Sequence, residues 1–510
     1  GDDVHDPVER ARAGEIVALD SVAGTLSLRR GPNLEDAPLP HALIPGGPYD
    51  TRYQREALAR FARSLIAGDG RYPHLEKVLR REPPLGGARV QRESLADMRR
   101  LVEEVEGSYL FVQGPPGAGK TWTGARLITH LIGLAKRVGV ASQSHKAIHN
   151  LLSEAVAAAR EEGVPLTALK KASGGNGESF YSGPGAVPDG EGPSNRLLQG
   201  QVVENETDAL AFVGAPHRLF AGTGWLFARE ELDGKLDYLF VDEAGQISLA
   251  DALALGTAAR TLVLLGDPIQ LAQVTQGIHP AGSGSSVLAH LLGERATVPE
   301  DMGLFLERSF RMHPDVCRYI SSAFYEDRLE SAEGCAAQGS SSGTGLRFVA
   351  VEHEGNSTSS EEEAASIYAE IELLLGGTWT DAEGVTRPIT PGDIMVVAPF
   401  NAQVKLLIEA LQPGVAVGTV DKFQGQQAPA VFFSMASSSG EDAPRGIDFL
   451  MSRNRLNVAV SRAQCVAYLV CAPRLLDVDC KTVEHMRLAN ALCRFVELAD
   501  PSWHGVDADV

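Results

Sequence analysis

The stretch GPPGAGKT, residues 114–121, combines small residues, a lysine and a threonine at a spacing that suits phosphate. Glycines let backbone N–H groups converge on phosphate oxygens, and the start of a following helix adds a favourable dipole. Lys120 would reach the β- and γ-phosphates of a nucleotide, and Thr121 would hold Mg²⁺. A glycine turn that merely closes onto a helix is the alternative, and the strand-like run YLFVQ before the motif argues against it. The predicted nucleotide-binding residues of this loop are Gly114, Pro115, Pro116, Gly117, Ala118, Gly119, Lys120 and Thr121.

An acidic pair follows a second apolar run in YLFVDEAGQ, residues 238–246. Asp242, at the end of the expected strand, would reach Mg²⁺ through its water shell, and Glu243 would polarise an attacking water. The alternative, an acidic cap at a strand end, is weak because charges beside so apolar a strand are costly without a role.

Two further segments carry groups suited to a nucleotide. Gln270, in LLGDPIQLAQ, is placed to sense a γ-phosphate, although Asp-Pro is also common in turns. RSFRMHP, residues 308–314, sets Arg311 beside Phe310, which pairs a cation for phosphate with an aromatic ring for a base. A surface arginine next to a core phenylalanine is an equally good interpretation of that pair.

A basic stretch near the end of the chain, RNRLNVAVSRA, offers Arg453, Arg455 and Arg462. One of them could act as an arginine finger that stabilises charge on the transferred phosphoryl group. We expect such a finger to lie in an open cleft and to contribute little packing. The alternative is a solvated basic surface.

The elements that must hold these residues alternate between buried strands and helices. This pattern predicts an α/β fold of parallel sheets, arranged as two domains in tandem. The strand-like runs are 109–113, 138–142, 237–244 and 261–267 in the first half, and 345–351, 394–400, 415–420, 430–435 and 467–472 in the second.

The predicted domain boundaries follow changes in composition. Residues 1–90 form an accessory module with a small β-hairpin or barrel at 13–30 and helices at 53–81. Residues 91–295 form the first domain, with a flexible insertion rich in Gly, Ser and Pro near 165–205. Residues 296–510 form the second domain.

Composition limits the class of protein. An apolar content of 44% over 510 residues is that of a globular protein, and no apolar run is long enough for a membrane span. The net charge of −20 argues weakly against nucleic acid, because an acidic protein can still carry a local basic groove. None of the six cysteines forms a CxxC pair, so we expect reduced thiols in a cytoplasmic protein. His145 and His149 have ligand spacing, but Lys146 replaces the glutamate of a zinc protease motif.

Taken in order, the motifs GPPGAGKT, VDEAGQ, GDPIQL, SFRMHP, TVDKFQGQ and LNVAVSRA resemble those of superfamily 1 helicases. They are most similar to the branch that includes the nonsense-mediated-decay RNA helicase, which moves 5′ to 3′. The resemblance covers residues from about 105 to about 475. It extends to the helicase half of bacterial proteins with a RecB-like nuclease upstream, and the start at Gly1 leads us to expect further sequence before it.

The resemblance implies two tandem RecA-like domains with ATP and Mg²⁺ between them. It implies that Lys120, Glu243, Gln270, Arg311 and Arg462 are the catalytic residues, with Thr121 and Asp242 at the metal. It adds Phe310 and Gly425 to the ATP-binding residues. It implies a single-stranded nucleic acid, DNA in preference to RNA, along Ser142, His145, Lys146, Asn150, Thr223, Pro399, Asn401 and Thr419.

This chain departs from the pattern of its relatives at three places. Gln427 replaces a glutamate, which weakens the expected ribose contact, and QLAQV at 270–274 replaces QLPPV. The glutamine that reads adenine has no clear counterpart, since Gln54 and Gln91 both lack the usual spacing.

The leading hypothesis is therefore an ATP-driven helicase or translocase, with a nuclease domain or partner as an accompaniment. A nucleotide-gated adaptor that barely hydrolyses ATP is the main alternative. The presence of both Glu243 and Arg462 disfavours it. A small-molecule kinase is disfavoured because no acceptor site is found in the sequence.

Overall fold

A computed structural model of the chain separates into two compact units, Gly1–Arg52 and Tyr53–Val510. The structure describes residues 2–9, 11–20, 24–35, 37–45, 50–187, 200–271, 283–423 and 425–499.

The first unit is a small antiparallel sheet with strand order β3-β2-β1-β4. The predicted hairpin at 13–30 is confirmed, because β2 and β3 pair antiparallel with Asp20 opposite Thr25. Residues 21–23 of its turn lie outside the described residues. The strands are β1 Asp2–Asp6, β2 Ala11–Asp20, β3 Thr25–Arg29 and β4 Ile44–Pro45.

Two helices at the start of the second unit, α1 (Arg52–Ala67) and α2 (Pro73–Arg80), pack on the first parallel sheet. The apolar core that they join includes the sheet residue Phe111. Polar contacts reinforce the packing, since the hydroxyl of Tyr72 donates to Asp233 over 2.9 Å. The sequence analysis placed these helices in the accessory module, whereas here they share a core with the first sheet. The domain boundaries at residues 90 and 295 stay predictions.

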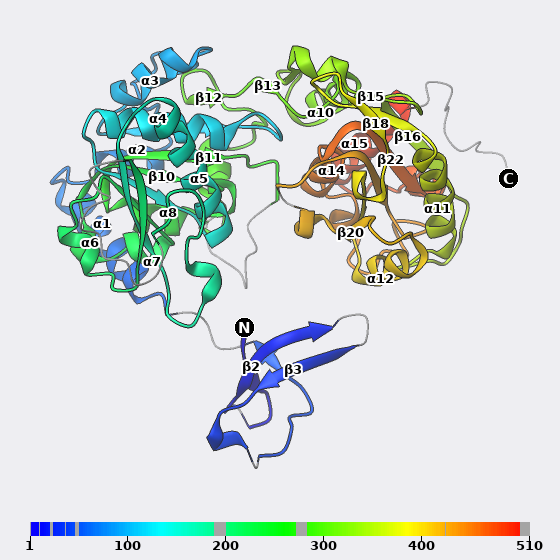
Figure 1. The fold of residues 1–510 in the computed structure, drawn as a ribbon, viewed down its shortest axis with the longest axis horizontal. Helices are drawn as coiled ribbons and strands as arrows, with labels where there is room; N and C mark the ends of the chain where they lie inside the picture. Colours follow the sequence, from blue (N-terminus) through cyan, green and yellow to red (C-terminus); the bar gives the residue numbers. More distant parts are fainter. Residues whose placement is uncertain are drawn as a thin grey trace. The chain divides into compact units, whose positions relative to one another are not determined.

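The first parallel sheet has the strand order β12-β5-β11-β10-β6-β9-β7-β8. Figure 1 labels its strands β10, β11 and β12 among the helices that surround them. All of its neighbouring strands pair in parallel, and the four predicted strands of this half are confirmed as β5, β6, β10 and β11. The strand bounds are β5 Tyr109–Gln113, β6 Val138–Ala141, β7 Leu166–Lys171, β8 Gln201–Glu206, β9 Leu219–Gly222, β10 Leu236–Val241, β11 Ala259–Gly266 and β12 Gly303–Phe305.

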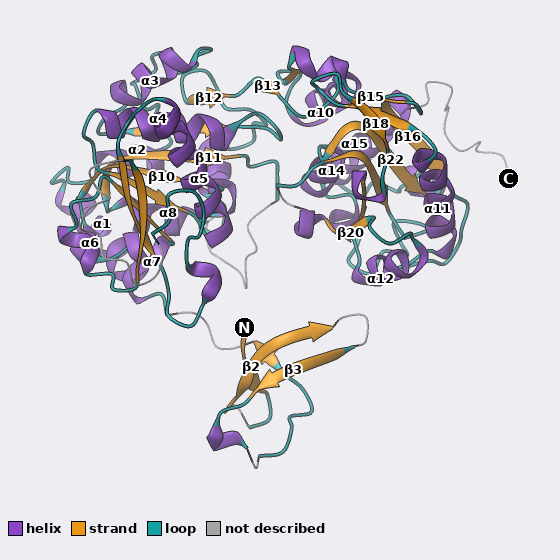
Figure 2. Cartoon of the chain, viewed as in Figure 1, coloured by secondary structure: helices purple, strands orange, loops and turns teal. Residues whose placement is uncertain are grey.

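Helices cover both faces of this sheet (Figure 2). Alternate residues of β5 show the two faces: Leu110 and Val112 belong to one core cluster, while Tyr109 and Phe111 belong to another. Burial on both faces explains why the strands read as continuous apolar runs. The helices α3, α4 and α5 supply the first cluster, and α1, α2, α8 and α9 supply the second. Their bounds are α3 Leu95–Glu104, α4 Lys120–Gly133, α5 His145–Glu161, α8 Leu249–Gly256 and α9 Val287–Leu292, with the short α6 Ala211–Gly214 and α7 Gly224–Phe227 nearby in the chain.

The second parallel sheet has the order β16-β22-β21-β19-β20, again with parallel neighbours throughout. The five predicted strands of this half are thereby confirmed, and with them the α/β fold. Its elements are β16 Gly345–Ala350, β19 Ile394–Ala398, β20 Ala416–Thr419, β21 Ala428–Ser434, β22 Ala463–Cys471, α10 Pro314–Phe324, α11 Glu361–Leu375, α12 Asn401–Ala410, α13 Ile447–Leu450, α14 Arg453–Val460 and α15 Val483–Ala499. Short strands form two smaller sheets: β13 Arg308–Ser309 with β14 Glu330–Ser331, and β15 Gly339–Ser340 with β17 Thr378–Thr380 and β18 Thr386–Pro388.

The cysteines are free thiols, as the sequence analysis expected. Burial raises the pKa of Cys317 to about 12, which keeps that thiol protonated. Among the described residues, no cluster of three or more His, Cys, Asp or Glu side chains is placed to hold a metal. No described helix is long and apolar enough to cross a membrane.

Candidate active site and nucleic-acid interface

The phosphate loop lies between β5 and α4, where residues 114–119 turn tightly onto the helix. Gly117 and Gly119 adopt φ angles of 75° and 77°, a left-handed conformation that glycine adopts without penalty. Lys120 folds back over the loop and donates to the carbonyl of Gly114 over 2.5 Å. A Cβ on Gly114 would lie 2.0 Å from Cγ of Lys120. The loop therefore tolerates only glycine at the positions that surround the lysine, as a cradle for phosphate requires.

The segment after β13 docks directly on this loop. The amide of Phe310 donates to the carbonyl of Gly117 over 2.9 Å, and Oγ of Ser309 donates to the carbonyl of Pro116 over 3.1 Å. A Cβ on Gly117 would lie 2.6 Å from Cβ of Arg311. The structure thus brings Arg311 against the phosphate loop. The ring of Phe310 is 67% exposed, so its face is accessible to a base.

The acidic pair lies directly after β10. Asp242 is buried, and its Oδ1 accepts the amide of Glu243 over 3.0 Å. Glu243 has a φ angle of 54°, which is uncommon for a residue with a side chain and is typical of functional turns. Burial and the charge of Glu243 raise the pKa of Asp242. A buried carboxylate in need of a cation, together with the hydroxyl of Thr121 in the first turn of α4, is a donor set that fits Mg²⁺.

Two arginines, the half-buried Arg311 and the buried Arg462, lie beside each other at the seam of the two sheets. Arg311 donates through Nε to Oε1 of Gln427 over 2.9 Å and through Nη1 to the carbonyl of Ser461 over 3.0 Å. Arg462 donates to the carbonyls of Val458 over 3.0 Å and Gln426 over 3.2 Å. Burial lowers the pKa of both groups; the charge of Arg462 adds to the effect on Arg311, while Glu243 opposes it at Arg462.

Within the described part of the chain, neither guanidinium has a carboxylate ion-pair partner. Buried cations without a partner are costly, so the arrangement is suited to an anionic ligand. The expectation that Arg462 lies in an open cleft is wrong for this structure, because Arg462 is only 2% exposed. Its guanidinium is held instead by the backbone carbonyls of Val458 and Gln426.

A buried polar chain crosses the seam next to these arginines. Tyr325, which ends α10, donates to Oδ2 of Asp267 over 2.6 Å and accepts from Nδ2 of Asn457 over 2.8 Å. Gln270 donates to the same Asp267 oxygen over 3.0 Å, and its own carbonyl accepts from Asn454. Sequence reasoning found Gln270 but missed its tyrosine and asparagine partners. Residues 272–274 of the unusual QLAQV segment lie outside the described residues.

The glutamines considered for reading adenine lie in other environments. Gln91 both donates to and accepts from the backbone of Phe305, over 3.0 and 2.8 Å. Its amide is therefore used to hold β12. Gln54 is buried on α1, and its Oε1 has no partner among the described residues. Gln427 accepts from Arg311, and nearby Gly425 has a φ angle of 81° with open space around it.

The residues predicted to contact nucleic acid in the first domain gather at the carboxyl ends of β6 and β9, which are neighbours. Lys146 and Asn150 are exposed on α5, His145 is half-buried at its first turn, and Thr223 caps α7. Ser142 is only 2% exposed, and its hydroxyl has no partner among the described residues.

In the second domain, the corresponding residues follow β19 and β20, where Ala398 pairs with Thr419. Asn401 is exposed at the start of α12, while Pro399 is buried beside it. In both sheets, the residues predicted to contact nucleic acid thus lie at the carboxyl ends of the β-strands. Sequence reasoning missed Lys170 and Lys171, which end β7 at the same edge as β9. A lysine pair directly after an apolar run was the available signal.

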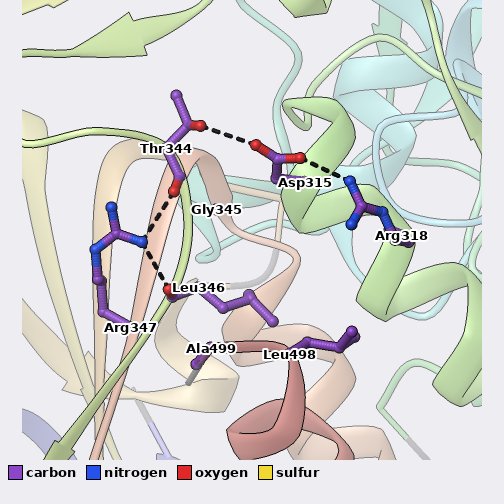
Figure 3. Close-up of a pocket in the computed structure, with 8 residues that line it drawn as sticks. All are labelled: Asp315, Arg318, Thr344, Gly345, Leu346, Arg347, Leu498 and Ala499. Atoms are coloured by element: carbon purple, nitrogen blue, oxygen red, sulfur yellow. Dashed lines mark hydrogen bonds and ion pairs between the residues drawn. The ribbon is translucent and has the colours of Figure 1, made fainter. Parts of the chain in front are cut away.

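A pocket in the second domain is lined by the charged residues Asp315, Arg318 and Arg347. Each of these side chains is hydrogen-bonded to neighbouring groups of the same pocket (Figure 3). Asp315 accepts from Arg318 over 2.8 Å and from Thr344 over 2.9 Å. Arg347 donates to the carbonyls of Thr344 and Leu346 over 3.1 and 2.9 Å. We therefore assign the nucleotide to the seam and not to this pocket.

Comparison with known proteins supports the fold of the two halves. Two family models match the chain, one over residues 96–283 and one over residues 285–474, and both are described as AAA domains. The fold and the site thus define a nucleotide-binding protein with two tandem RecA-like domains.

Three relatives narrow the class. The chain is 25% identical over 467 residues to the regulator of nonsense transcripts 1 homolog of Drosophila melanogaster, an alignment covering 83% of this chain and 38% of that protein. It is 26% identical over 413 residues to the ATP-dependent helicase NAM7 of Saccharomyces cerevisiae, covering 72% and 40%. It is 24% identical over 427 residues to the DNA replication ATP-dependent helicase/nuclease JHS1 of Arabidopsis thaliana, covering 78% and 30%.

These comparisons indicate a superfamily 1 helicase of the branch that includes the regulator of nonsense transcripts, as the motifs predicted. The chain spans well under two thirds of the length of these three relatives.

Proposed function

We propose that the protein is an ATP-dependent helicase or translocase that acts on single-stranded nucleic acid. One observation supports this most strongly: the half-buried Arg311 and the buried Arg462 lack a carboxylate partner within the described residues, and Arg311 lies against the phosphate loop at the seam with the second domain. A triphosphate at this seam would supply the missing negative charge. Residues from both domains would then share one ligand.

Each residue of the seam has a distinct task in hydrolysis. Lys120 leaves the carbonyl of Gly114 to bind the β- and γ-phosphates, and Arg311 and Arg462 balance charge that develops on the transferred phosphoryl group. Glu243 accepts a proton from the attacking water, since the strained turn after β10 presents its carboxylate towards Arg462. Thr121 and Asp242 would hold Mg²⁺, which supplies charge neutralisation between the phosphates when bound.

Movement follows from the same contacts. Loss of the γ-phosphate removes an anion from between Arg311, Arg462 and the phosphate loop, so the seam is held less tightly. The polar chain through Asp267 and Tyr325 passes this change to α10 and α14. The residues at the carboxyl edges of the two sheets would then bind the nucleic-acid strand alternately, which moves the protein one step per cycle.

We favour DNA as the strand, because one of the relatives is named as a DNA replication helicase/nuclease. We favour 5′-to-3′ movement because the motifs resemble those of the branch that moves in this direction. A nuclease domain or partner would match the first of these relatives. We place the protein in the cytoplasm, in line with its free thiols.

A strand-stimulated ATPase assay tests the proposal. ATP hydrolysis is measured alone, with single-stranded DNA and with single-stranded RNA of equal length, with Lys120→Ala as the inactive control. We expect about tenfold or greater stimulation by the preferred strand, as binding completes the closed seam. Hydrolysis that no strand stimulates would favour the nucleotide-gated adaptor instead.

A further inference from the structure

Lys170 is a fully buried ammonium at the edge of the first sheet. Lys170 is 0% exposed, and its Nζ donates to three acceptors. These are the carbonyl of Lys171 at 2.6 Å, the carbonyl of Ser179 at 3.0 Å and Nδ1 of His145 at 3.2 Å. An ammonium has three hydrogens to donate, so all of its hydrogen-bonding capacity is used. Lys170 therefore has no free hydrogen for a ligand of its own.

The contact with His145 fixes the state of that ring. Burial and Lys171 lower the pKa of Lys170 to about 8, so this group is still mostly an ammonium at neutral pH, and an ammonium donates but does not accept. Nδ1 of His145 therefore accepts, and the proton of the neutral imidazole lies on Nε2. Burial, the two lysines Lys170 and Lys171, and His149 lower the pKa of His145 to about 4. The ring therefore stays neutral at physiological pH, with one N–H directed away from Lys170.

The position of this N–H matches the expected path of the strand. His145 is the first residue of α5, which follows β6. β9 lies between β6 and β7 in the sheet, and Lys170 pairs with Ala221 just before Thr223. A Cβ on Gly222 would lie 3.2 Å from Cβ of Lys171, which shows how closely the two strand ends approach. No described group is bonded to Nε2 of His145.

We propose that Lys170 is a positioning residue that presents His145 to the bound strand as a neutral Nε2–H donor for a backbone phosphate. This inference rests on the proposed function. The groups that face the imidazole are Lys170 and Lys171 from β7 and His149 from α5 itself. All three are bases, so within the described residues the ring faces no carboxylate that favours its protonation. Strand binding through this donor is accordingly insensitive to pH over the range in which a free histidine titrates.

The first experiment measures the tautomer and the titration of the His145 ring directly. Nitrogen NMR of the full chain, labelled at histidine, reports which nitrogen of His145 carries the proton and at what pH the ring titrates, with His145→Gln used for assignment. We expect an Nε2–H tautomer that resists protonation down to about pH 5. A proton on Nδ1, or titration near about pH 6.5, would overturn the proposal whether or not any variant folds.

The second experiment measures how tightly the protein binds a nucleic-acid strand at different pH values. Binding of a fluorescent oligo-dT is measured from about pH 5.5 to about pH 7.5 for the parent, Lys170→Met, His145→Phe and the double variant, with Lys171→Met as the matched control. Without Lys170 the pKa of His145 rises, so the ring gains charge as the pH falls and affinity increases. We expect the affinity ratio between the two ends of this range to grow by about threefold or more in Lys170→Met, and to return to the parent value in the double variant. His145→Phe should weaken binding by about threefold to tenfold at every pH.

The outcomes separate this inference from the proposed function. If the parent binds the strand and hydrolyses ATP, but the pH profile of Lys170→Met parallels that of the parent, this inference alone is wrong. If the parent binds no strand, the proposed function fails and this inference fails with it. A Lys171→Met profile as steep as that of Lys170→Met would also contradict the specific role given to Lys170.

Discussion

Tyr325 and Asp267 form a hydrogen bond of 2.6 Å that joins the two halves of the protein through their buried seam. Asp267 follows β11 of the first sheet, and Tyr325 ends the first helix that precedes the second sheet. The same tyrosine oxygen accepts from Asn457 of α14, three residues from the helix end that leads to Arg462. Nucleotide chemistry at the first sheet is therefore connected by hydrogen bonds to the helix that carries the second domain's arginine.

Substituting Tyr325 by Phe should uncouple strand binding from hydrolysis. The change removes one hydroxyl and leaves the ring in place. Asp267 and Asn457 each lose the hydrogen-bond partner that the hydroxyl supplied. We expect the free energy of unfolding to fall by about 1–2 kcal/mol. We expect ATP affinity to stay within about twofold, while stimulation of hydrolysis by the strand falls about tenfold, because the seam closes less firmly. Nucleotide titration and ATPase assays with and without DNA measure both effects.

Tyr319→Phe is the matched control for that variant. Tyr319 lies on the same helix, is equally buried, and donates to the carbonyl of Ala491 over 2.9 Å within the second domain. Its loss should cost similar stability and leave stimulation intact. Equal losses of stimulation in both variants would show that the Tyr325 contact has no special role in coupling.

Gly117→Ala should disrupt the docking of Arg311 on the phosphate loop. The added Cβ would lie 2.6 Å from Cβ of Arg311 and 2.9 Å from Oγ of Ser309, in a left-handed backbone conformation. We expect ATP affinity to fall by about tenfold or more, since the loop and the arginine cannot both keep their places. Gly107→Ala is the control, because Gly107 has a similar φ angle of 77° and a Cβ added there would have no atom within 4 Å. It should lose about 1 kcal/mol of stability and keep its ATP affinity.

Glu243→Gln should bind ATP normally and hydrolyse it slowly. The amide keeps the size of the carboxylate and cannot accept the proton of the attacking water. We expect turnover to fall by about a hundredfold or more, as loss of a general base does. Single-turnover hydrolysis and equilibrium binding of a nucleotide analogue measure the two properties separately. A normal rate in this variant would show that another group activates the water.

The phosphate-binding part of the site was predictable because its chemistry depends on neighbours in the chain. The spacing from Gly114 to Thr121 determines a loop that ends in a helix, and Asp242 follows a strand whose apolar run is unambiguous. Parallel strands bring these loops to one edge of the sheet, so their meeting follows from the fold. The nine apolar runs predicted all five strands of the second parallel sheet and four of the eight strands of the first, β5, β6, β10 and β11.

Contacts between distant segments were not predictable in the same way. Tyr325, Asn457 and Lys170 have no motif around them, and their roles depend on which side chains the folded chain places opposite them. The burial of Arg462 also depends on packing, since an arginine in a stretch that also holds Arg453 and Arg455 could equally lie on a solvated basic surface. The strands β7 and β8 were missed because their runs are short and end in charged or polar residues.

Selectivity among nucleotides should be weak. The amide of Gln91 is held at both ends by the backbone of Phe305, so it is not available to read the edge of adenine. Stacking on the exposed ring of Phe310 accepts any base. We expect kcat/KM for GTP to lie within about fivefold of that for ATP, because phosphate contacts carry most of the binding. A preference for ATP greater than about a hundredfold, measured in a strand-stimulated assay, would require a base-specific hydrogen bond.

Arg311→Met should separate nucleotide binding from the stability of the nucleotide-free protein. The substitution removes a half-buried cation whose pKa is lowered by desolvation and by Arg462, and it leaves an apolar chain of similar length. Replacing such a group often leaves stability unchanged or increases it, so we expect the nucleotide-free Tm to stay within a few degrees of the parent. The rise in Tm that saturating ATP analogue and Mg²⁺ produce should shrink by more than half, because one phosphate partner is gone. Arg318→Met, which removes an exposed arginine from α10, should retain the full rise. A nucleotide-dependent rise in Arg311→Met equal to that of the parent would mean that the two arginines are buried for structural reasons, and the triphosphate would have to lie elsewhere.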